Sequence, residues 1–133
     1  METPTSPTEV ATDRDVWCAG FGVISHDETT RVRIDALADR LVAAGVVAER
    51  DEVFRILTAA DRLANAAMWL VVHMTYARRV DPQGAPLSVE DFKATPEGHT
   101  GGSLNMVPAY IGYMAANALT GATRSWIMGQ GHC

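Results

Sequence analysis

The sequence predicts a mostly α-helical part of an α/β fold, with one short strand near its C-terminus. Apolar residues recur at the helical spacing of about 3.6 over long stretches, whereas only residues 123–128 have the pattern of a strand. The 133 residues are enough for one domain with a hydrophobic core. We therefore expect a mobile tail and irregular arm over residues 1–30 and one incomplete domain over residues 31–133.

The amino-acid composition argues against several classes of function. The chain is 47% hydrophobic and 20% charged, as is typical of folded proteins, and its net charge of −5 argues against nucleic-acid binding. Its apolar runs stay below the roughly 18 residues of a membrane span, and the N-terminus lacks the apolar core of a secretion signal. The cysteines Cys18 and Cys133 form no CxxC pair. We expect a cytoplasmic protein without a membrane or nucleic-acid partner.

The N-terminal quarter of the chain leads into a first helix. Residues 1–15 are rich in Thr, Pro, Ser and acids, which predicts a mobile tail, and residues 16–24 are predicted to be irregular. One apolar face at helical spacing predicts a helix over residues 32–44. Gly45 follows where a left-handed helix cap is expected, because glycine adopts positive φ without strain.

The second helix is predicted most clearly, because its apolar stripe runs unbroken over residues 53–74. Asp51 is the expected N-cap, since its carboxylate can accept backbone amide hydrogens. The arginines at 78–79 suit the negative end of the helix dipole, and Asp81-Pro82 should end the helix. The many alanines and the length predict that this helix is packed between other elements.

The remaining elements are a short helix, a loop and a third long helix. Residues 88–91 read as a helix start, and residues 95–103 read as a glycine-containing loop. Proline removes a backbone hydrogen bond inside a helix, so we expect regular helix to begin near Pro108, after an entry turn. Gly121 should end that helix before the strand.

Two short segments place histidine among glycines. They are residues 98–105, which begin Gly-His-Thr-Gly, and residues 129–132, which read Gly-Gln-Gly-His. Glycine lets the backbone approach a ligand and turn its amides toward an anion, and Ser103 adds a hydroxyl near a helix start. His99 and His132 can donate to a phosphate or move protons near neutral pH. The two turns together indicate a phosphorylated ligand held between them, with capping or surface histidines as the alternative.

The second of these turns stands where the printed sequence stops, so we expect the chain to supply part of a site rather than a whole one. The other histidines have simpler interpretations: His26 as part of a polar helix start and His73 as a packed or partly exposed helix residue. Cys133 beside His132 does not predict a metal site, because structural zinc uses about four ligands.

The sequence resembles thiamine-diphosphate enzymes of the transketolase group. Residues 98–104 are similar to their Gly-His-x-Gly segment, and residues 129–132 are similar to the Gly-x-Gly-His turn of the phosphoketolase branch, which acts on xylulose 5-phosphate or fructose 6-phosphate. Residues 61–70 resemble an early helix of that branch, and residues 85–93 resemble its Pro-Leu…Lys approach to the Gly-His segment. The resemblance covers roughly residues 51–133.

This resemblance implies a thiamine-diphosphate-binding fold, with thiamine diphosphate and Mg²⁺ as cofactors and a ketose phosphate as substrate. The implied reaction is that of a lyase, carbon–carbon cleavage giving acetyl phosphate and an aldose phosphate. His99 and His132 would be catalytic, and His99 with Ser103 would bind substrate. The cofactor would be bound by Gly98, Gly101, Gly129, Gly131 and His132.

Departures from the family pattern leave alternatives open. The spacing around Ser103 is closer to transketolase, and Thr100 replaces the aromatic residue usual after the phosphoketolase histidine, so a transketolase-like transferase or a sugar-phosphate epimerase subunit fits as well. The family's Gly-Asp-Gly magnesium motif and its activating glutamate are not in this chain. We therefore expect inactivity without a completing chain, and a homo-oligomer when complete. The alternative is a non-catalytic helical docking module or a decayed fragment.

Overall fold

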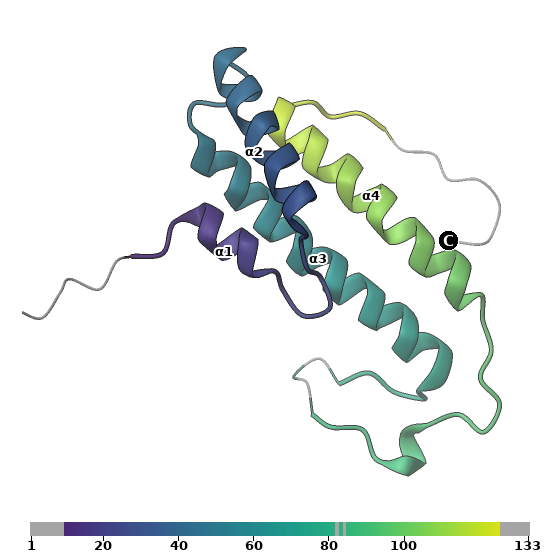
Figure 1. Ribbon diagram of the computed structural model, residues 1–133. Helices are drawn as coiled ribbons and strands as arrows, with labels where there is room; N and C mark the ends of the chain where they lie inside the picture. The colour runs from purple at the N-terminus through teal and green to yellow at the C-terminus, as the bar shows by residue number, and fades with distance from the viewer. Residues whose placement is uncertain (1–9, 82, 84, 126–133) are drawn as a thin grey trace, which may run out of the picture.

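The structure, a computed structural model, describes residues 10–81, 83 and 85–125. Its elements are helix α1 (Asp13–Ala19), α2 (Glu28–Ala43), α3 (Arg50–Tyr76), the 3-10 turn η1 (Val89–Asp91) and α4 (Thr100–Thr120). Figure 1 shows α4 running antiparallel beside α3, with α1 and α2 near the N-terminal half of α3. The prediction of a mostly helical chain is confirmed. Within the described residues, β-pairing is limited to two isolated bridges.

Helix α1 corrects the expectation of a tail followed by an irregular arm. Thr12 and Asp15 form a reciprocal capping box, in which each side chain accepts the other residue's backbone amide. Trp17, on this short helix, is only 2% exposed. The cap and the burial of one large aromatic ring together stabilise a helix too short to show an apolar period.

Helix α2 begins earlier than predicted and ends as predicted. Its N-cap is Asp27, whose carboxylate accepts the Thr30 amide at 2.7 Å. At the C-terminal end Gly45 has φ 68°, the left-handed conformation expected of it. The amides of Gly45 and Val46 donate to carbonyls of the last turn, which is the Schellman arrangement.

Helix α3 is displaced at both ends relative to the prediction. Its N-cap is Glu49, and the predicted cap Asp51 lies in the first turn. The helix ends at Tyr76 because Ala77 takes an extended conformation and forms an antiparallel bridge with Phe92. The chain thus turns back before the arginines that were expected to close the helix.

Helix α4 begins at Thr100 and therefore contains residues predicted to be a loop and an entry turn. Pro108 lies inside it and is exposed, so the loss of one backbone hydrogen bond is tolerated on the solvent side. Gly121 ends the helix with φ 64°, as predicted. The predicted short helix at residues 88–91 is present as η1, capped by Ser88 and Asp91.

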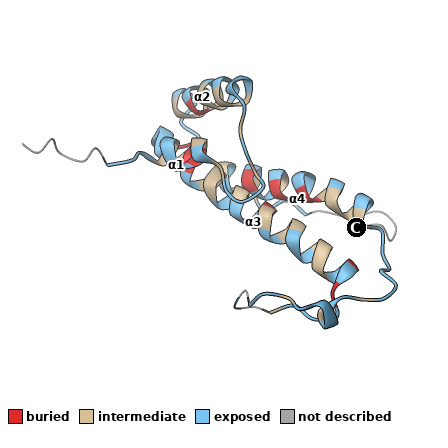
Figure 2. Cartoon of the chain, turned by 60° about the horizontal axis from the view of Figure 1, so that its bottom comes forward, coloured by how far each residue is buried: buried red, intermediate tan, exposed pale blue. Residues whose placement is uncertain are grey.

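The core consists of two clusters, visible as the red segments in Figure 2. The larger cluster joins α1, α2 and α3, with partly buried side chains around it. The smaller lies between α3 and α4, which form the most extensive helix pair. The buried residues are Trp17, Ala38, Val47, Val53 and Phe54 in the first cluster, and Ala64, Val107 and Ile111 in the second.

The chain beyond α4 runs back along that helix (Figure 1). The Tyr113 hydroxyl donates to the Ser125 carbonyl at 2.8 Å, and the Asn117 amide donates to the Arg124 carbonyl at 3.4 Å. Residues 123–125 are not in a strand, and the rest of the predicted strand, 126–128, lies outside the described residues. No described helix is both long enough and apolar enough to cross a membrane.

Candidate functional site

The first Gly-His turn lies where the connection from α3 enters α4. His99 is exposed and occupies the N-cap position of α4, and its carbonyl accepts the Ser103 amide at 3.0 Å. This is the first i to i−4 bond of the helix, so His99 and Ser103 stand one turn apart. The structure thus brings together the two residues predicted to contact the substrate.

Gly98 is required by the geometry of this turn. Its φ of 133° is a conformation that side chains disfavour, and a Cβ atom there would lie 3.4 Å from Thr75 Oγ1. Thr100 Oγ1 donates to the same Thr75 oxygen at 2.9 Å, and the Thr75 hydroxyl donates to the Val71 carbonyl at 3.0 Å. Because Thr75 is buried, this chain of hydrogen bonds fixes the turn to the end of α3.

The connection between α3 and the turn is held by an ion pair. The Arg79 guanidinium donates to both Asp91 carboxylate oxygens, at 2.6 and 3.0 Å. These bonds, with the amide of Ser88, hold the pKa of the Asp91 carboxyl well below its usual range. The Lys93 ammonium adds a 2.6 Å hydrogen bond to the Met74 carbonyl. The segment leading to His99 is therefore tied to α3 by several bonds.

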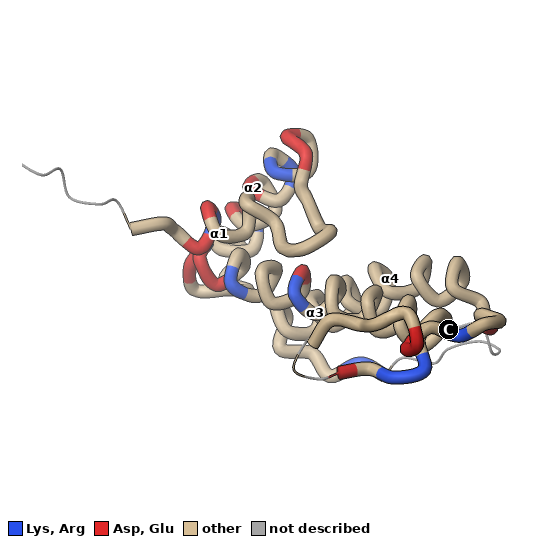
Figure 3. The backbone as a smooth tube through the Cα atoms, turned by 90° about the horizontal axis from the view of Figure 1, so that it is seen from below, with Lys and Arg blue, Asp and Glu red and all other residues tan. Residues whose placement is uncertain are grey.

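The electrostatics of the helix start favour an anion. The first amides of an α-helix have no partner inside the helix, and the helix dipole is positive at that end. The first turn of α4 contains no acidic residue, and its N-cap side chain forms no capping hydrogen bond among the described residues. None of the 21 residues from Thr100 to Thr120 is charged, and α4 is tan throughout in Figure 3. Phosphate groups bind at helix starts of this kind.

The glycines of the turn have different roles. Gly98 supplies the positive φ of the turn, whereas Gly101 is helical, exposed and has open space among the described residues where a side chain would lie. That space lies in the first turn, beside the amides expected to bind an anion. Among the residues that the structure describes, no side chain therefore blocks the approach of a ligand to the backbone at Gly101.

The second Gly-His turn falls outside the described residues. Gly129, Gly131 and His132 belong to residues 126–133, so their approach to His99 stays a prediction. Across the described ranges, no three His, Cys, Asp or Glu side chains are grouped to hold a metal ion.

A cavity of about 230 Å³ adjoins the turn through Leu104, the residue after Ser103. Its other lining residues come from α3 and from the connection between α1 and α2: Val23, Met68, Trp69 and Val72. These side chains carry no charge, and their one polar group is the indole N–H of Trp69, so the cavity offers little to a sugar or phosphate. A polar ligand at this end of α4 would therefore bind at the exposed start of the helix rather than in this cavity.

The structure also shows a histidine–carboxylate pair that sequence reasoning missed. His26 Nε2 lies 2.7 Å from Asp61 Oδ2, and the imidazole stacks on Trp17 with ring centroids 4.2 Å apart. His26, which was expected to belong to a polar helix start, thus links the α1–α2 connection to α3. The partners are 35 positions apart, and no local pattern signals such a pair.

His73 behaves as expected of a helix residue. Its Nδ1 atom lies 2.8 Å from the Trp69 carbonyl one turn earlier, and the two rings meet edge to face. These local contacts explain the position of the His73 imidazole without a bound ligand.

No family model, curated protein or solved structure matches this chain.

Proposed function

We propose that this chain is the N-terminal portion of a thiamine-diphosphate enzyme that cleaves ketose phosphates with inorganic phosphate, giving acetyl phosphate, an aldose phosphate and water. The supporting observation is the start of α4, where His99 and Ser103 stand one turn apart at an uncharged helix N-terminus. An anionic group at these amides would lie within reach of an imidazole and a hydroxyl. That combination suits binding and proton transfer on a phosphorylated substrate.

Each residue of the turn has a proposed role. His99 moves protons and, with Ser103, holds oxygens of the sugar phosphate. Gly98 and Gly101 form part of the cofactor-binding region. Gly129, Gly131 and His132 form the second half of the site. When bound, thiamine diphosphate supplies the stabilisation of the carbanion formed on cleavage. The chain lacks the Gly-Asp-Gly motif, so a completing polypeptide would hold Mg²⁺ and complete the homo-oligomeric enzyme.

A transketolase-like transferase or an epimerase subunit is the nearest alternative chemistry. Thr100 stands where the phosphoketolase branch has an aromatic side chain, and its hydroxyl donates to Thr75 on α3. Thr100 therefore contributes a scaffold bond, and no aromatic ring follows His99 to help enclose a small reacting group. The products of the completed enzyme distinguish these reactions.

A non-catalytic docking module is the second candidate class, and the exposed apolar side chains of α3 favour it. Trp69, Leu70 and Met74 are 49%, 49% and 64% exposed. Large apolar side chains grouped on one surface are typical of a binding surface. Such a module would bind a partner without binding the cofactor.

The decisive experiment uses the chain together with the polypeptide encoded after Cys133 or by the neighbouring reading frame. Calorimetric titration of thiamine diphosphate with Mg²⁺ should show binding by the pair and little by the chain alone. Acetyl phosphate formation should fall about 100-fold or more in His99→Ala, because positioned proton transfer contributes at least that much. His73→Ala is the matched control, and we expect unchanged activity.

Three results would contradict the proposal. Absence of cofactor binding by the completed pair would favour the docking module. Full activity in His99→Ala, or in His132→Ala, would remove these imidazoles from the chemistry. Transfer of the two-carbon unit to an aldose phosphate, in place of acetyl phosphate formation, would identify the transketolase-like alternative.

A further inference from the structure

One side of α3 is left open between α1 and α4. Ala59, Leu63 and Ala66 are spaced four and three residues apart, so their side chains form one stripe along the helix. All three are exposed among the described residues, and Leu63 is 48% exposed. We call this stripe the open face of α3. The buried residues of α3 belong to its other sides: Val53, Phe54, Ala64 and Thr75.

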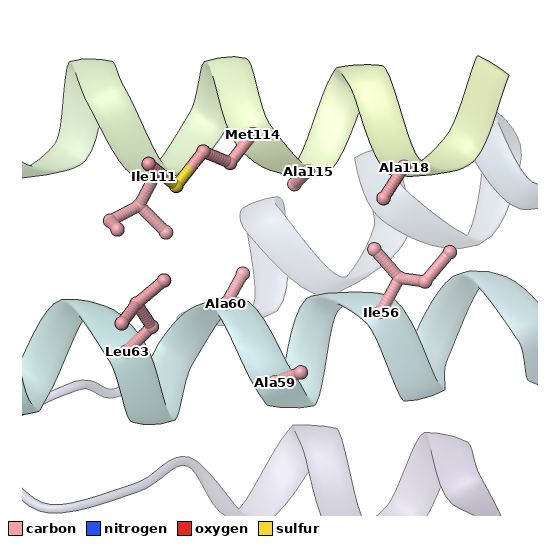
Figure 4. A pocket seen from close by; sticks show the side chains of 8 residues that line it. All are labelled: Ile56, Ala59, Ala60, Leu63, Ile111, Met114, Ala115 and Ala118. Carbon is pink, nitrogen blue, oxygen red and sulfur yellow. The ribbon is translucent and has the colours of Figure 1, made fainter. Parts of the chain in front are cut away.

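A hollow of about 210 Å³ lies on the α4 side of the open face, and Figure 4 shows side chains of both helices pointing toward it. Ala59 and Leu63 line it from α3, and Met114, which is 56% exposed, lines it from α4. Every lining residue is alanine, isoleucine, leucine or methionine, and α4 has no charged residue. This side of the open face therefore suits apolar side chains.

A second hollow, of about 270 Å³, lies on the α1 side of the open face and is also lined by Ala59. Its charged lining residues are Arg55 and Arg62 of α3 and Asp13 of α1. Arg55 pairs with Asp13 at 2.9 Å, whereas the exposed Arg62 forms no ion pair with any described residue. The Arg62 guanidinium instead lies over the Phe21 ring, 5.3 Å from its centroid. The two sides of the open face thus differ in chemistry.

We propose that the open face of α3 binds an amphipathic helix of another polypeptide, which places apolar side chains toward α4 and an acidic side chain beside Arg62. An amphipathic helix that lays its apolar side into a groove is a common form of protein recognition. Burying Leu63 and Met114, which are about half exposed, favours such binding.

The spacing of the residues along this face fits a helical occupant. Positions 56, 59, 63, 66 and 70 are separated alternately by three and four residues, which is the spacing of the seam between two packed helices. Large side chains at Ile56, Leu63 and Leu70 alternate with Ala59 and Ala66, where the small side chain lets a second backbone approach closely. The seam extends over about 21 Å, or four helical turns.

The far end of the seam leaves room for the occupant. Ala66 and Leu70 line a cavity of about 520 Å³ between α3 and the connection that follows it, whose residues Val80 and Leu87 form the opposite wall. A bound helix therefore meets no described side chain that fills this end of the seam.

Arg62 determines the charge of the occupant. A guanidinium binds a carboxylate through two parallel hydrogen bonds, and Arg62 has no carboxylate partner among the described residues. A charged pair at the rim of an interface sets specificity and orientation, while the apolar centre excludes water. Because α4 has no charged residue, the acidic edge of the bound helix has only one side on which it finds a partner.

A second copy of this chain is a poorer occupant. Two copies carry a formal charge of −5 each, which opposes their association, and a second open face brings another arginine to Arg62 rather than a carboxylate. The open face also lies apart from the candidate site, since Ala59 is about 24 Å along α3 from Thr75. The inference therefore does not rest on the proposed enzymatic function.

The test uses the full chain and two fluorescein-labelled synthetic peptides of about five helical turns, or 18 residues. Both peptides have a leucine stripe at heptad spacing, and they differ only along one edge, which has glutamates in one and lysines in the other. Fluorescence anisotropy measures their affinities. We expect the glutamate peptide to bind about 10-fold more tightly. The net charge of −5 favours the lysine peptide, so this preference isolates the effect of Arg62.

Charge reversal tests the role of Arg62. Arg62→Glu should reverse the order of the two affinities, because the variant presents a carboxylate to the lysine peptide. Arg33→Glu is the matched control, since it makes the same change of net charge at an exposed position of α2 outside both hollows. It should leave the preference for glutamate in place.

A charge within the open face tests the apolar contact. Leu63→Glu should weaken the binding of both peptides by about 10-fold or more, because the new carboxylate loses its hydration on binding. Ala109→Glu, at an exposed position of α4 outside the hollow, is the control and should leave both affinities unchanged. If Leu63→Glu loses helix content by circular dichroism, Ala66→Gln, which adds bulk without charge, replaces it.

Four outcomes would overturn the proposal. They are the absence of saturable binding of either peptide, equal or lysine-preferring binding by the parent chain, equal effects of the test and control substitutions, and self-association. In the last case light scattering would show a doubled mass without peptide that is lost in Leu63→Glu, which would assign the open face to a second copy. A preference for glutamate that only Arg62→Glu reverses supports an acidic amphipathic helix as the occupant.

Discussion

The two halves of α3 show the same kind of apolar pattern in the sequence but differ in how fully the chain covers them. In the N-terminal half, Val53 and Phe54 are at most 1% exposed, beneath Trp17 of α1 and Ala38 of α2. In the C-terminal half, Trp69 is 49% exposed. The first half is thus a self-contained core, whereas the second half presents an apolar surface that further structure could cover.

The helices around α3 differ in their charged residues. Near the N-terminal half, Asp35 of α2 accepts hydrogen bonds from Arg14 of α1 and Arg50 of α3, which ties three helices together. Helix α4, which runs along α3, has no charged residue (Figure 3). Charged side chains on a protein surface oppose burial against a partner. Their absence from α4 is consistent with a helix that is covered when the site is complete.

The largest expected difference between the regions is in stability. Phe54→Ala should lower the free energy of unfolding by about 3–5 kcal/mol, because it leaves a cavity in the larger core cluster. Phe92→Ala is the matched control, since Phe92 is 49% exposed, and it should cost about 1 kcal/mol or less. Urea unfolding followed by circular dichroism measures both. Equal losses would mean that the region around Phe92 is as well packed as the core.

Glycine substitutions should have opposite signs in the two regions. Gly22→Ala should destabilise by about 1–3 kcal/mol, because Gly22 has φ 59° and an added methyl group would overlap the Asn65 side chain. That side chain also accepts the Val23 amide, at 3.0 Å. Gly112→Ala should stabilise by about 1 kcal/mol, because this glycine lies inside α4 with open space around it.

Thermal unfolding of the two glycine variants, with the parent chain as reference, measures this difference. A destabilising Gly112→Ala would show that the exposed face of α4 already packs against something in the isolated chain. A neutral Gly22→Ala would show that the α1–α2 connection is not held against α3 by Asn65.

Sequence periodicity predicted the long helices well because each has enough turns to show its apolar face. It also predicted the caps at Gly45 and Gly121, since positive φ restricts the choice of residue. It missed α1 because seven residues with one buried ring show no period. It placed the start of α4 too late because glycines and Pro108 disfavour helix locally, whereas packing against α3 and the Thr100–Thr75 bond act over long range.

The candidate site was predictable only where its residues are neighbours in the sequence. His99 and Ser103 are four positions apart, so the start of a helix brings them together. The supporting contact to Thr75 spans 25 positions and gave no local signal. The His26–Asp61 pair is of the same kind, since a long-range contact depends on the packing of α3 rather than on a motif.

The smallest expected effect is the pH dependence of the ion-pair network in the N-terminal region. The Arg14 guanidinium holds the pKa of the Asp35 carboxyl below its usual value of about 3.9, so the folded state favours the charged form. The stabilisation is therefore present above pH 4 and is lost as the pH falls through the folded pKa. Because these side chains are partly exposed, Asp35→Asn should cost only about 1 kcal/mol at pH 7. Urea unfolding at pH 7 and pH 3 measures this effect, and the free energies of unfolding of the parent and the variant should converge at the lower pH. If Asp35→Asn costs as much at pH 3 as at pH 7, packing of the side chain, rather than its charge, accounts for the loss.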